Sequence, residues 1–94
     1  MATHVLKADP NPFQDMWDGL KTFELRFNDR DFKVGNFLDL KETGHTGIEM
    51  KAGAPLKYTG RSLLVEVTYL LTGYGLSDGF CVMSVKAICH GHGD

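Results

Sequence analysis

Residues 22–27 alternate strictly between polar and apolar side chains. The apolar members, which we expect to share one face, are Phe23, Leu25 and Phe27. The polar members, expected on the opposite face, are Thr22, Glu24 and Arg26. A period of two is typical of a β-strand with one face against a core. We therefore predict a strand that packs its apolar face on the core and presents a hydroxyl, a carboxylate and a guanidinium on the other.

Upstream of this strand the apolar pattern changes to a helical period. Four apolar residues follow the spacing i, i+3, i+4 and i+7, namely Phe13, Met16, Trp17 and Leu20. Asp9 or Asn11 is a suitable N-cap, and the two prolines that follow Asp9 and Asn11 fit a first helical turn. Gly19 is a natural C-terminal stop. The pattern predicts a short helix that packs this stripe on the core, a commoner role for its aromatic residues than base stacking.

The remaining apolar runs predict further strands at residues 4–7, 37–40, 63–71 and 80–88. Glycine and proline interrupt residues 44–56, which we interpret as an irregular loop, with or without a short hairpin at residues 48–50. We expect this loop to form the edge of a binding site. Residues 89–94 are expected to form a frayed tail.

These elements predict one domain over residues 1–94, of the α+β class and mainly β. Short strands, glycine-rich turns and one helix favour a small β-barrel or a strongly curved sheet with a packed N-terminal helix. The expected core consists of Phe13, Met16, Trp17, Phe23, Leu25, Phe37, Val65 and Val67.

Composition narrows the classes of function. The chain has 94 residues and a net charge of −2, which argues against strong non-specific nucleic-acid binding. No apolar run approaches the length of a membrane span and no signal-peptide pattern is present, so we expect a cytoplasmic protein that does not contact a membrane. Cys81 and Cys89 are expected to be free thiols.

The segment Cys89-His90-x-His92 raises the question of a metal site. Its spacing matches no usual zinc pattern, and we expect no metal and no cofactor. The chain also shows no glycine-rich phosphate loop.

An ordered set of short motifs resembles a known family. The motif Gly19-x-Lys21-x-x-Glu24-x-Arg26, with Asn28-Asp29-Arg30, Tyr58-Thr59-Gly60-Arg61 and Val67-Thr68-Tyr69, is similar to the ASCH domain of the PUA-like superfamily. The resemblance is greatest to an ASCH-related family of small bacterial and phage proteins of unknown function. It implies a PUA-like β-barrel with a cleft beside the motif strand, and binding of RNA or a nucleotide.

The side chains of the motif strand have two interpretations. Glu24 and Arg26 form either a structural ion pair or the wall of a polar cleft. In a cleft, a guanidinium suits a phosphate or guanine, and a carboxylate accepts from the exocyclic amine of cytosine. The predicted ligand-binding residues are Lys21, Thr22, Glu24, Arg26, Tyr58 and Arg61. Tyr58 either stacks on a base or packs at the edge of the core.

A second branch of the same superfamily is enzymatic, and these amidohydrolases remove acyl groups from N4-acetylcytidine. They resemble this chain in Gly19-x-Lys21-Thr22, but Glu24 stands where they carry the catalytic threonine. We therefore expect a binding module for RNA or a small nucleotide-like ligand, acting as a monomer. The alternative is an amidohydrolase in which Glu24 or Glu66 activates a water molecule and Lys21 stabilises the oxyanion.

Overall fold

The computed structural model describes residues 2–92 and shows a mainly β domain with two helices. The strands are β1 (Thr3–Ala8), β2 (Phe23–Phe27), β3 (Phe37–Thr43), β4 (Tyr58–Leu71) and β5 (Phe80–His92). The helices are α1 (Pro10–Trp17) and α2 (Gly47–Lys51). The predicted α+β class and the single packed N-terminal helix are confirmed.

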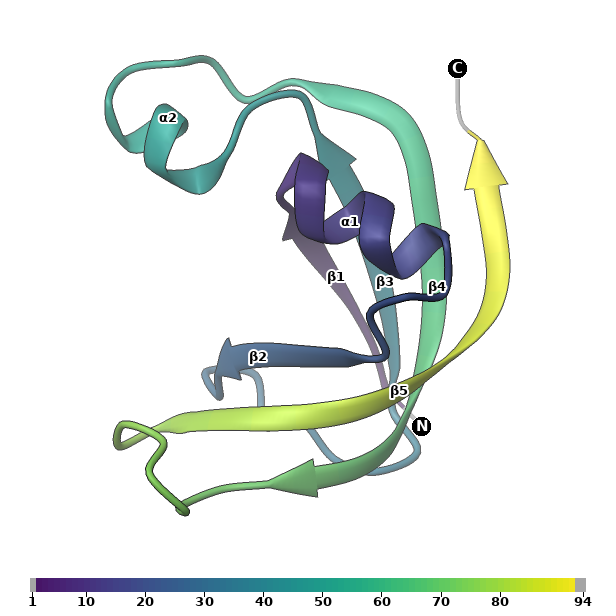
Figure 1. Cartoon of the computed structure of the whole chain (residues 1–94), viewed down its shortest axis with the longest axis vertical. Coiled ribbons are helices and arrows are strands. Elements are labelled where there is room, and N and C mark those ends of the chain that lie inside the picture. Colours follow the sequence, from purple (N-terminus) through teal and green to yellow (C-terminus); the bar gives the residue numbers. More distant parts are fainter. Residues whose placement is uncertain (1, 93–94) are drawn as a thin grey trace.

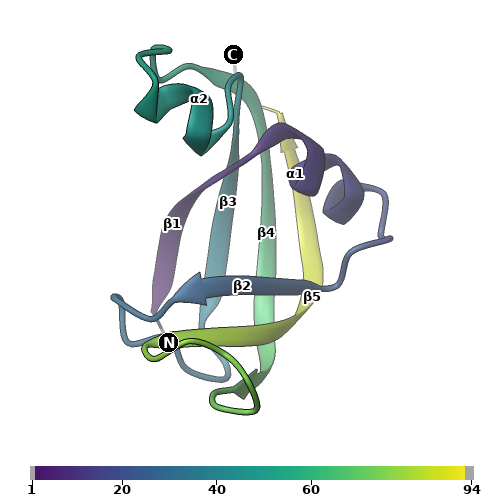
Figure 2. The same ribbon diagram turned by 60° about the vertical axis from the view of Figure 1, so that its left-hand side comes forward.

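All five of these strands belong to one sheet, in the order β1-β3-β4-β5-β2. β1 pairs with β3 in parallel, and the other pairs are antiparallel. The register between β4 and β5 shifts at two places, after Leu64 and after Val67. Such irregularities bend strands and increase their twist. The sheet consequently curls into a half-barrel, and Figures 1 and 2 show α1 lying across its concave side.

The two edge strands of the half-barrel, β1 and β2, are joined by side chains. Arg26 on β2 donates from Nη2 to the carbonyl oxygen of Lys7 at 2.7 Å. Arg30, just beyond β2, donates from Nη1 to the carbonyl oxygen of Val5 at 2.8 Å. Carbonyls on the free edge of a strand lack ladder partners, and these two guanidinium groups supply them. Arg26 and Arg30 therefore tie the sheet edges together.

The core lies between the concave face of the sheet and α1. Its buried apolar residues are Leu6, Ala8, Phe13, Met16, Phe32, Leu38, Leu40, Leu63, Val65, Val67, Cys81, Met83 and Val85. The predictions for Phe13, Met16, Val65 and Val67 are confirmed. Trp17 packs against this core while partly exposed, Phe37 is half-buried, and Leu20 is exposed beyond the end of α1.

The predicted orientation of β2 is wrong. Phe23 and Leu25 are exposed, whereas Glu24 is only 6% exposed. The pairing with β5 explains the reversal, because Glu24 lies opposite the buried Met83 and therefore shares its face. Alternation sets which residues share a face but does not set which face points inward.

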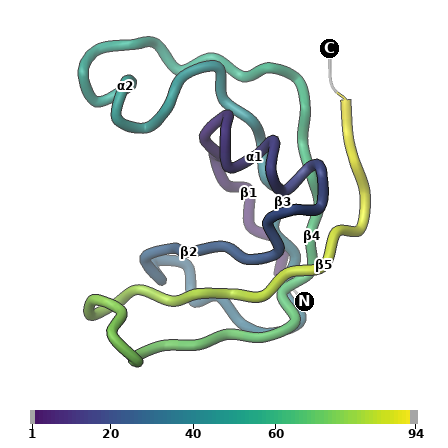
Figure 3. Tube along the Cα trace, in the orientation of Figure 1, coloured from purple at the N-terminus to yellow at the C-terminus, as the bar shows by residue number. Residues whose placement is uncertain are grey.

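The segment from residue 44 to 56 contains α2, so the interpretation as an irregular loop or hairpin is wrong. Thr46 and Glu49 form a reciprocal capping box: the Glu49 amide donates to Thr46 Oγ1 and the Thr46 amide donates to Glu49 Oε1. This pattern of threonine followed three residues later by glutamate is a recognised helix start. Figure 3 shows α2 projecting away from the sheet.

The predicted frayed tail is also wrong over its first four residues. β5 continues to His92, and its end pairs with the start of β4 from Arg61 to Leu64. His90 Nε2 lies 3.1 Å from the carbonyl oxygen of Trp17. Residues 93–94 lie outside the described residues.

Candidate functional site

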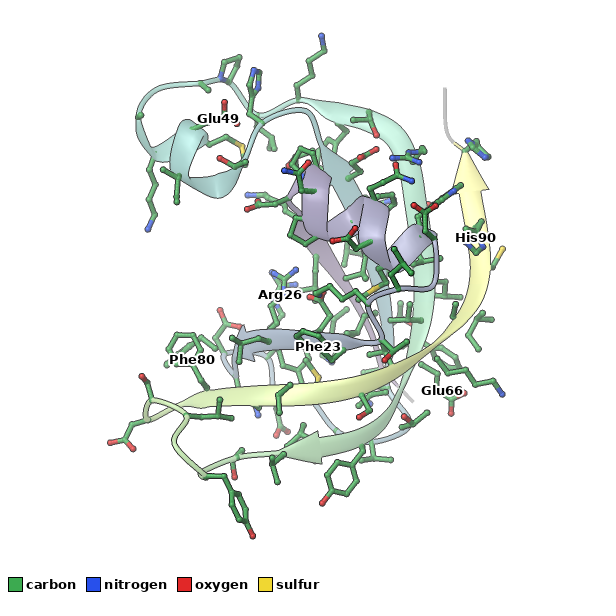
Figure 4. All side chains as sticks on the ribbon, viewed as in Figure 1. Phe23, Arg26, Glu49, Glu66, Phe80 and His90 are labelled. Carbon is green, nitrogen blue, oxygen red and sulfur yellow. The ribbon has the colours of Figure 1, made fainter. Side chains whose placement is uncertain are left out.

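A cavity of about 410 Å³ lies between α1, the end of β1 and β2. Its apolar wall comes from the helix and from β3, through Phe13, Met16 and Leu40. Its polar wall comes from β2 and the residues before it. The other lining residues are Lys7, Ala8, Asp9, Pro12, Lys21, Phe23, Glu24, Leu25 and Arg26. Figure 4 shows the Arg26 side chain extending from β2 toward α1.

Three side chains of the motif strand form a compact ionic cluster on the polar wall. Lys21 Nζ donates to Glu24 Oε1 at 2.9 Å, and Arg26 Nε donates to Glu24 Oε2 at 2.9 Å. Lys21 Nζ also donates to the carbonyl oxygen of Phe23 at 2.7 Å. Each carboxylate oxygen thus accepts a charge-assisted hydrogen bond, which satisfies the requirement for burying Glu24.

The ionisable groups that line the cavity carry a net positive charge. The cations are Lys7, Lys21 and Arg26, and the anions are Asp9 and Glu24. Asp9 Oδ1 accepts from the amide of Gly47 at 3.0 Å, which fixes it toward α2. Arg26 uses Nε and Nη2 for Glu24 and Lys7, and no hydrogen-bond partner of its Nη1 is found among residues 2–92. The cavity is therefore suited to an anionic ligand.

The structure does not bring every predicted ligand residue to this cavity. Thr22 is exposed, and its carbonyl oxygen accepts from the amide of Val85 at 3.0 Å. Tyr58 is exposed at the start of β4, opposite Thr43. Neither residue lines the cavity, so only Lys21, Glu24 and Arg26 of the predicted set do so.

Arg61 lies outside the cavity wall and makes a structural ion pair. Its Nε and Nη2 donate to Glu42 Oε1 and Oε2, both at 2.9 Å, and Nη2 also donates to Gln14. The guanidinium lies over the Trp17 ring, 4.8 Å from its centroid. The hydrogen bonds from Arg61 lower the pKa of Glu42, and the same contact raises the pKa of Arg61.

The chemistry of the lining residues bears on catalysis. None of the residues that line the cavity is a serine, threonine or cysteine. Cys81 is buried in the core, and burial raises the pKa of its thiol, which is typical of an inert structural cysteine. Covalent hydrolysis requires an activated nucleophile within hydrogen-bond reach of a base, and the wall offers no hydroxyl or thiol for this role.

Sequence reasoning missed two polar residues of the site, Lys7 and Asp9. Lys7 is a basic residue at the end of the first predicted strand, and the pattern there does not mark it as a site residue. Asp9 is predicted only as a possible helix cap. Both reach the cavity because β1 leads directly into α1 and the helix turns back over the sheet. The sequence carries no separate signal for this placement.

Residues 2–92 show neither a cluster of metal-ligating side chains nor a helix that could span a membrane. No group of three or more histidine, cysteine, aspartate or glutamate side chains in this range is arranged to hold a metal ion. Neither helix in this range has the length and apolar character needed to cross a membrane.

The fold and the cavity define a small half-barrel domain with a ligand-sized cavity beside an edge strand, lined by both polar and apolar residues. A family model described as a domain of unknown function (DUF3850) matches residues 3–85. The chain belongs to this family. No curated protein matches the chain.

Proposed function

We propose that the chain binds RNA or a small nucleotide-like ligand, with one nucleotide occupying the cavity. The observation that carries the proposal is the combination of an apolar wall with a cationic one in a single cavity of about 410 Å³. This volume is in the lower part of the range of ligand sites, about 300–1,000 Å³. It suits one nucleotide and excludes a duplex.

The two walls suit the two halves of a nucleotide. Among the apolar residues of the lining, Pro12, Phe23 and Leu25 are exposed and offer surface to a base. Arg26 offers a guanidinium to a phosphate. Glu24 and Lys7 already engage Nε and Nη2 of Arg26, so Nη1 is the nitrogen that offers its donors to the phosphate. These donors have a fixed direction that the point charge of lysine does not reproduce. Glu24 holds Lys21 and Arg26 in position, since both of its oxygens already accept from these cations.

The chain's overall charge favours recognition in the cavity over general attraction to nucleic acid. A net charge of −2 supplies little non-specific affinity for a phosphate backbone. RNA would therefore enter through one unpaired nucleotide whose base is free to leave the stack. Double-stranded nucleic acid is expected to bind weakly.

The binding prediction concerns nucleoside monophosphates. We expect CMP, UMP, AMP or GMP to raise the melting temperature, and a ligand at 100 times its dissociation constant adds about 2.7 kcal/mol of stability. Arg26→Lys keeps the charge but loses the Nη1 donors, and should weaken binding about tenfold or more. The measurements are a thermal-shift panel followed by isothermal titration calorimetry.

Lys86→Ala is the matched control, because Lys86 is an exposed cation on β5 outside the cavity. It should bind like the wild type. A short unpaired RNA and the corresponding nucleosides complete the panel. Equal affinity of the wild type and Arg26→Lys for every ligand, or no binding of any ligand, would contradict the proposal.

The hydrolysis prediction separates binding from the amidohydrolase alternative. We expect no release of cytidine from N4-acetylcytidine, because the cavity wall carries no hydroxyl or thiol nucleophile and both oxygens of Glu24 are held by cations. The measurement is a chromatographic assay of cytidine over time. Robust wild-type turnover that is lost in both Lys21→Ala and Glu24→Ala would instead support a water-activating role for Glu24.

A further inference from the structure

One face of the sheet, opposite the core, carries large apolar side chains. We call it the outer apolar face and define it by Phe23, Leu25, Phe27, Tyr69 and Phe80. Their exposed fractions lie between 38% and 59%. None of them is needed to explain the cavity's polar wall. Apolar residues scattered singly over a surface need no explanation, but a contiguous group on one face does.

Strand pairing shows that these side chains are contiguous. Phe27 lies opposite Phe80, and Leu25 lies opposite Val82, which in turn faces Leu71 on β4. Directly opposed residues of antiparallel strands project to the same face. Phe23 and Tyr69 complete the face, since both lie opposite Ser84 from its two sides.

Close contacts restrain the aromatic side chains of the outer apolar face. The rings of Phe27 and Phe80 form an edge-to-face pair with centroids 5.5 Å apart. The Phe27 ring also packs so closely on Gly79 that a β-carbon at that position would collide with it. These contacts hold the aromatic side chains in place, which reduces the entropy lost when a partner binds.

Size and charge indicate the occupant. A large apolar side chain buries about 150–250 Å² when it is fully enclosed. At the exposed fractions given above, the five side chains together expose on the order of 500 Å² of apolar surface. A standard interface buries about 800 Å² per partner, of which somewhat more than half is apolar. We propose that this face binds the same face of a second copy of the chain, forming a two-fold symmetric dimer.

Charge on the face favours a second copy over nucleic acid. Lys86 lies opposite Glu66 at the border of the face, so their charges offset each other. The ammonium of Lys21 lies 4.7 Å from the centroid of the Phe23 ring but is already paired with Glu24. A nucleic-acid platform would instead combine aromatic residues with unpaired cations along the strand path.

The outer apolar face adjoins the cavity and shares two residues with it. β2 carries Glu24 and Arg26 on its inner face and the apolar residues on its outer face, so the dimer contact and the polar wall use opposite sides of one strand. Phe23 and Leu25 also border the cavity. The second copy would consequently lie beside the cavity mouth.

The test is the mass of the chain in solution as a function of concentration, measured by sedimentation equilibrium. We expect the wild type to pass from one 10.4-kDa chain to two as its concentration rises from micromolar to millimolar. Leu25→Glu places an unpaired charge between Phe23 and Phe27 on the face and should raise the dimer dissociation constant about a hundredfold or more. Phe80→Ser, at its edge, should raise it less.

Ile48→Glu is the matched control, because Ile48 is an exposed apolar residue on α2, away from the outer apolar face. It should dimerise like the wild type, and circular dichroism should show that all variants are folded. A wild type that stays monomeric at every concentration, or a dimer that Leu25→Glu leaves intact, would overturn the proposal. Loss of binding to a labelled unpaired RNA in Phe80→Ser, whose position does not line the cavity, with a monomeric wild type, would overturn it in favour of a stacking platform.

Discussion

Replacing Phe13 by alanine is expected to lower the free energy of unfolding by about 3–5 kcal/mol, the range for removing a buried aromatic ring. Phe13 is 1% exposed and fixes α1 to the concave face of the sheet. Its ring also packs against the Trp17 ring, and the two ring centroids lie 5.8 Å apart. Alanine would leave a void among these groups, and the loss would be a large share of the stability of a domain this small.

Urea denaturation followed by circular dichroism measures this loss. Phe23→Ala is the matched control, because it removes the same side chain from a position that is 45% exposed. We expect it to cost less than about 1 kcal/mol in dilute solution, where no dimer forms. Equal losses in the two variants would show that Phe23 packs in the core, as we expected from the sequence.

Replacing Glu42 by alanine is expected to have the second largest effect, a loss of about 3 kcal/mol. This lies at the lower end of the range for breaking a buried ion pair, because the Arg61 side chain is partly exposed. The substitution would leave Arg61 without its bidentate partner while it still lies over Trp17. It would also remove the acceptor of the Thr59 hydroxyl.

Urea denaturation again supplies the measurement, and Asp39→Ala is the control. Asp39 pairs with Lys41 at 3.5 Å on the surface, so its loss should change stability by no more than about 1 kcal/mol. A loss at Glu42 as small as the loss at Asp39 would contradict the assignment of Arg61 and Glu42 as a structural pair.

The same pair predicts a dependence of stability on pH. Hydrogen bonds from Arg61 hold the pKa of Glu42 below its ordinary value of 4.5. A carboxyl group whose pKa is lower in the folded state stabilises the fold fully above the ordinary value, and the contribution disappears as the pH falls through the folded value. The stability difference between wild type and Glu42→Gln should thus be constant near neutral pH and shrink below about pH 4.5. A difference that stays constant into strong acid would contradict this.

Local patterns predicted most of the elements. The i, i+3, i+4 spacing located α1, and β-branched and aromatic runs located the strands, because both periods follow from backbone geometry within one segment. The helix α2 was also predictable from the sequence, since Thr46 and Glu49 form a capping box. The neighbouring glycines and proline instead favoured an interpretation as a loop. The extension of β5 to His92 depends on pairing with β4, which no local pattern shows.

Local sequence is sufficient to show that Glu24 and Arg26 share one face of a strand and that Lys21 precedes them, because side chains alternate strictly along an extended backbone. That this face points inward depends on contacts between strands. The register of β2 on β5 places Glu24 beside Met83, and two cations make its burial tolerable. The tertiary structure also separated Arg61 from the cavity and added Lys7, since both positions depend on contacts between segments far apart in the chain.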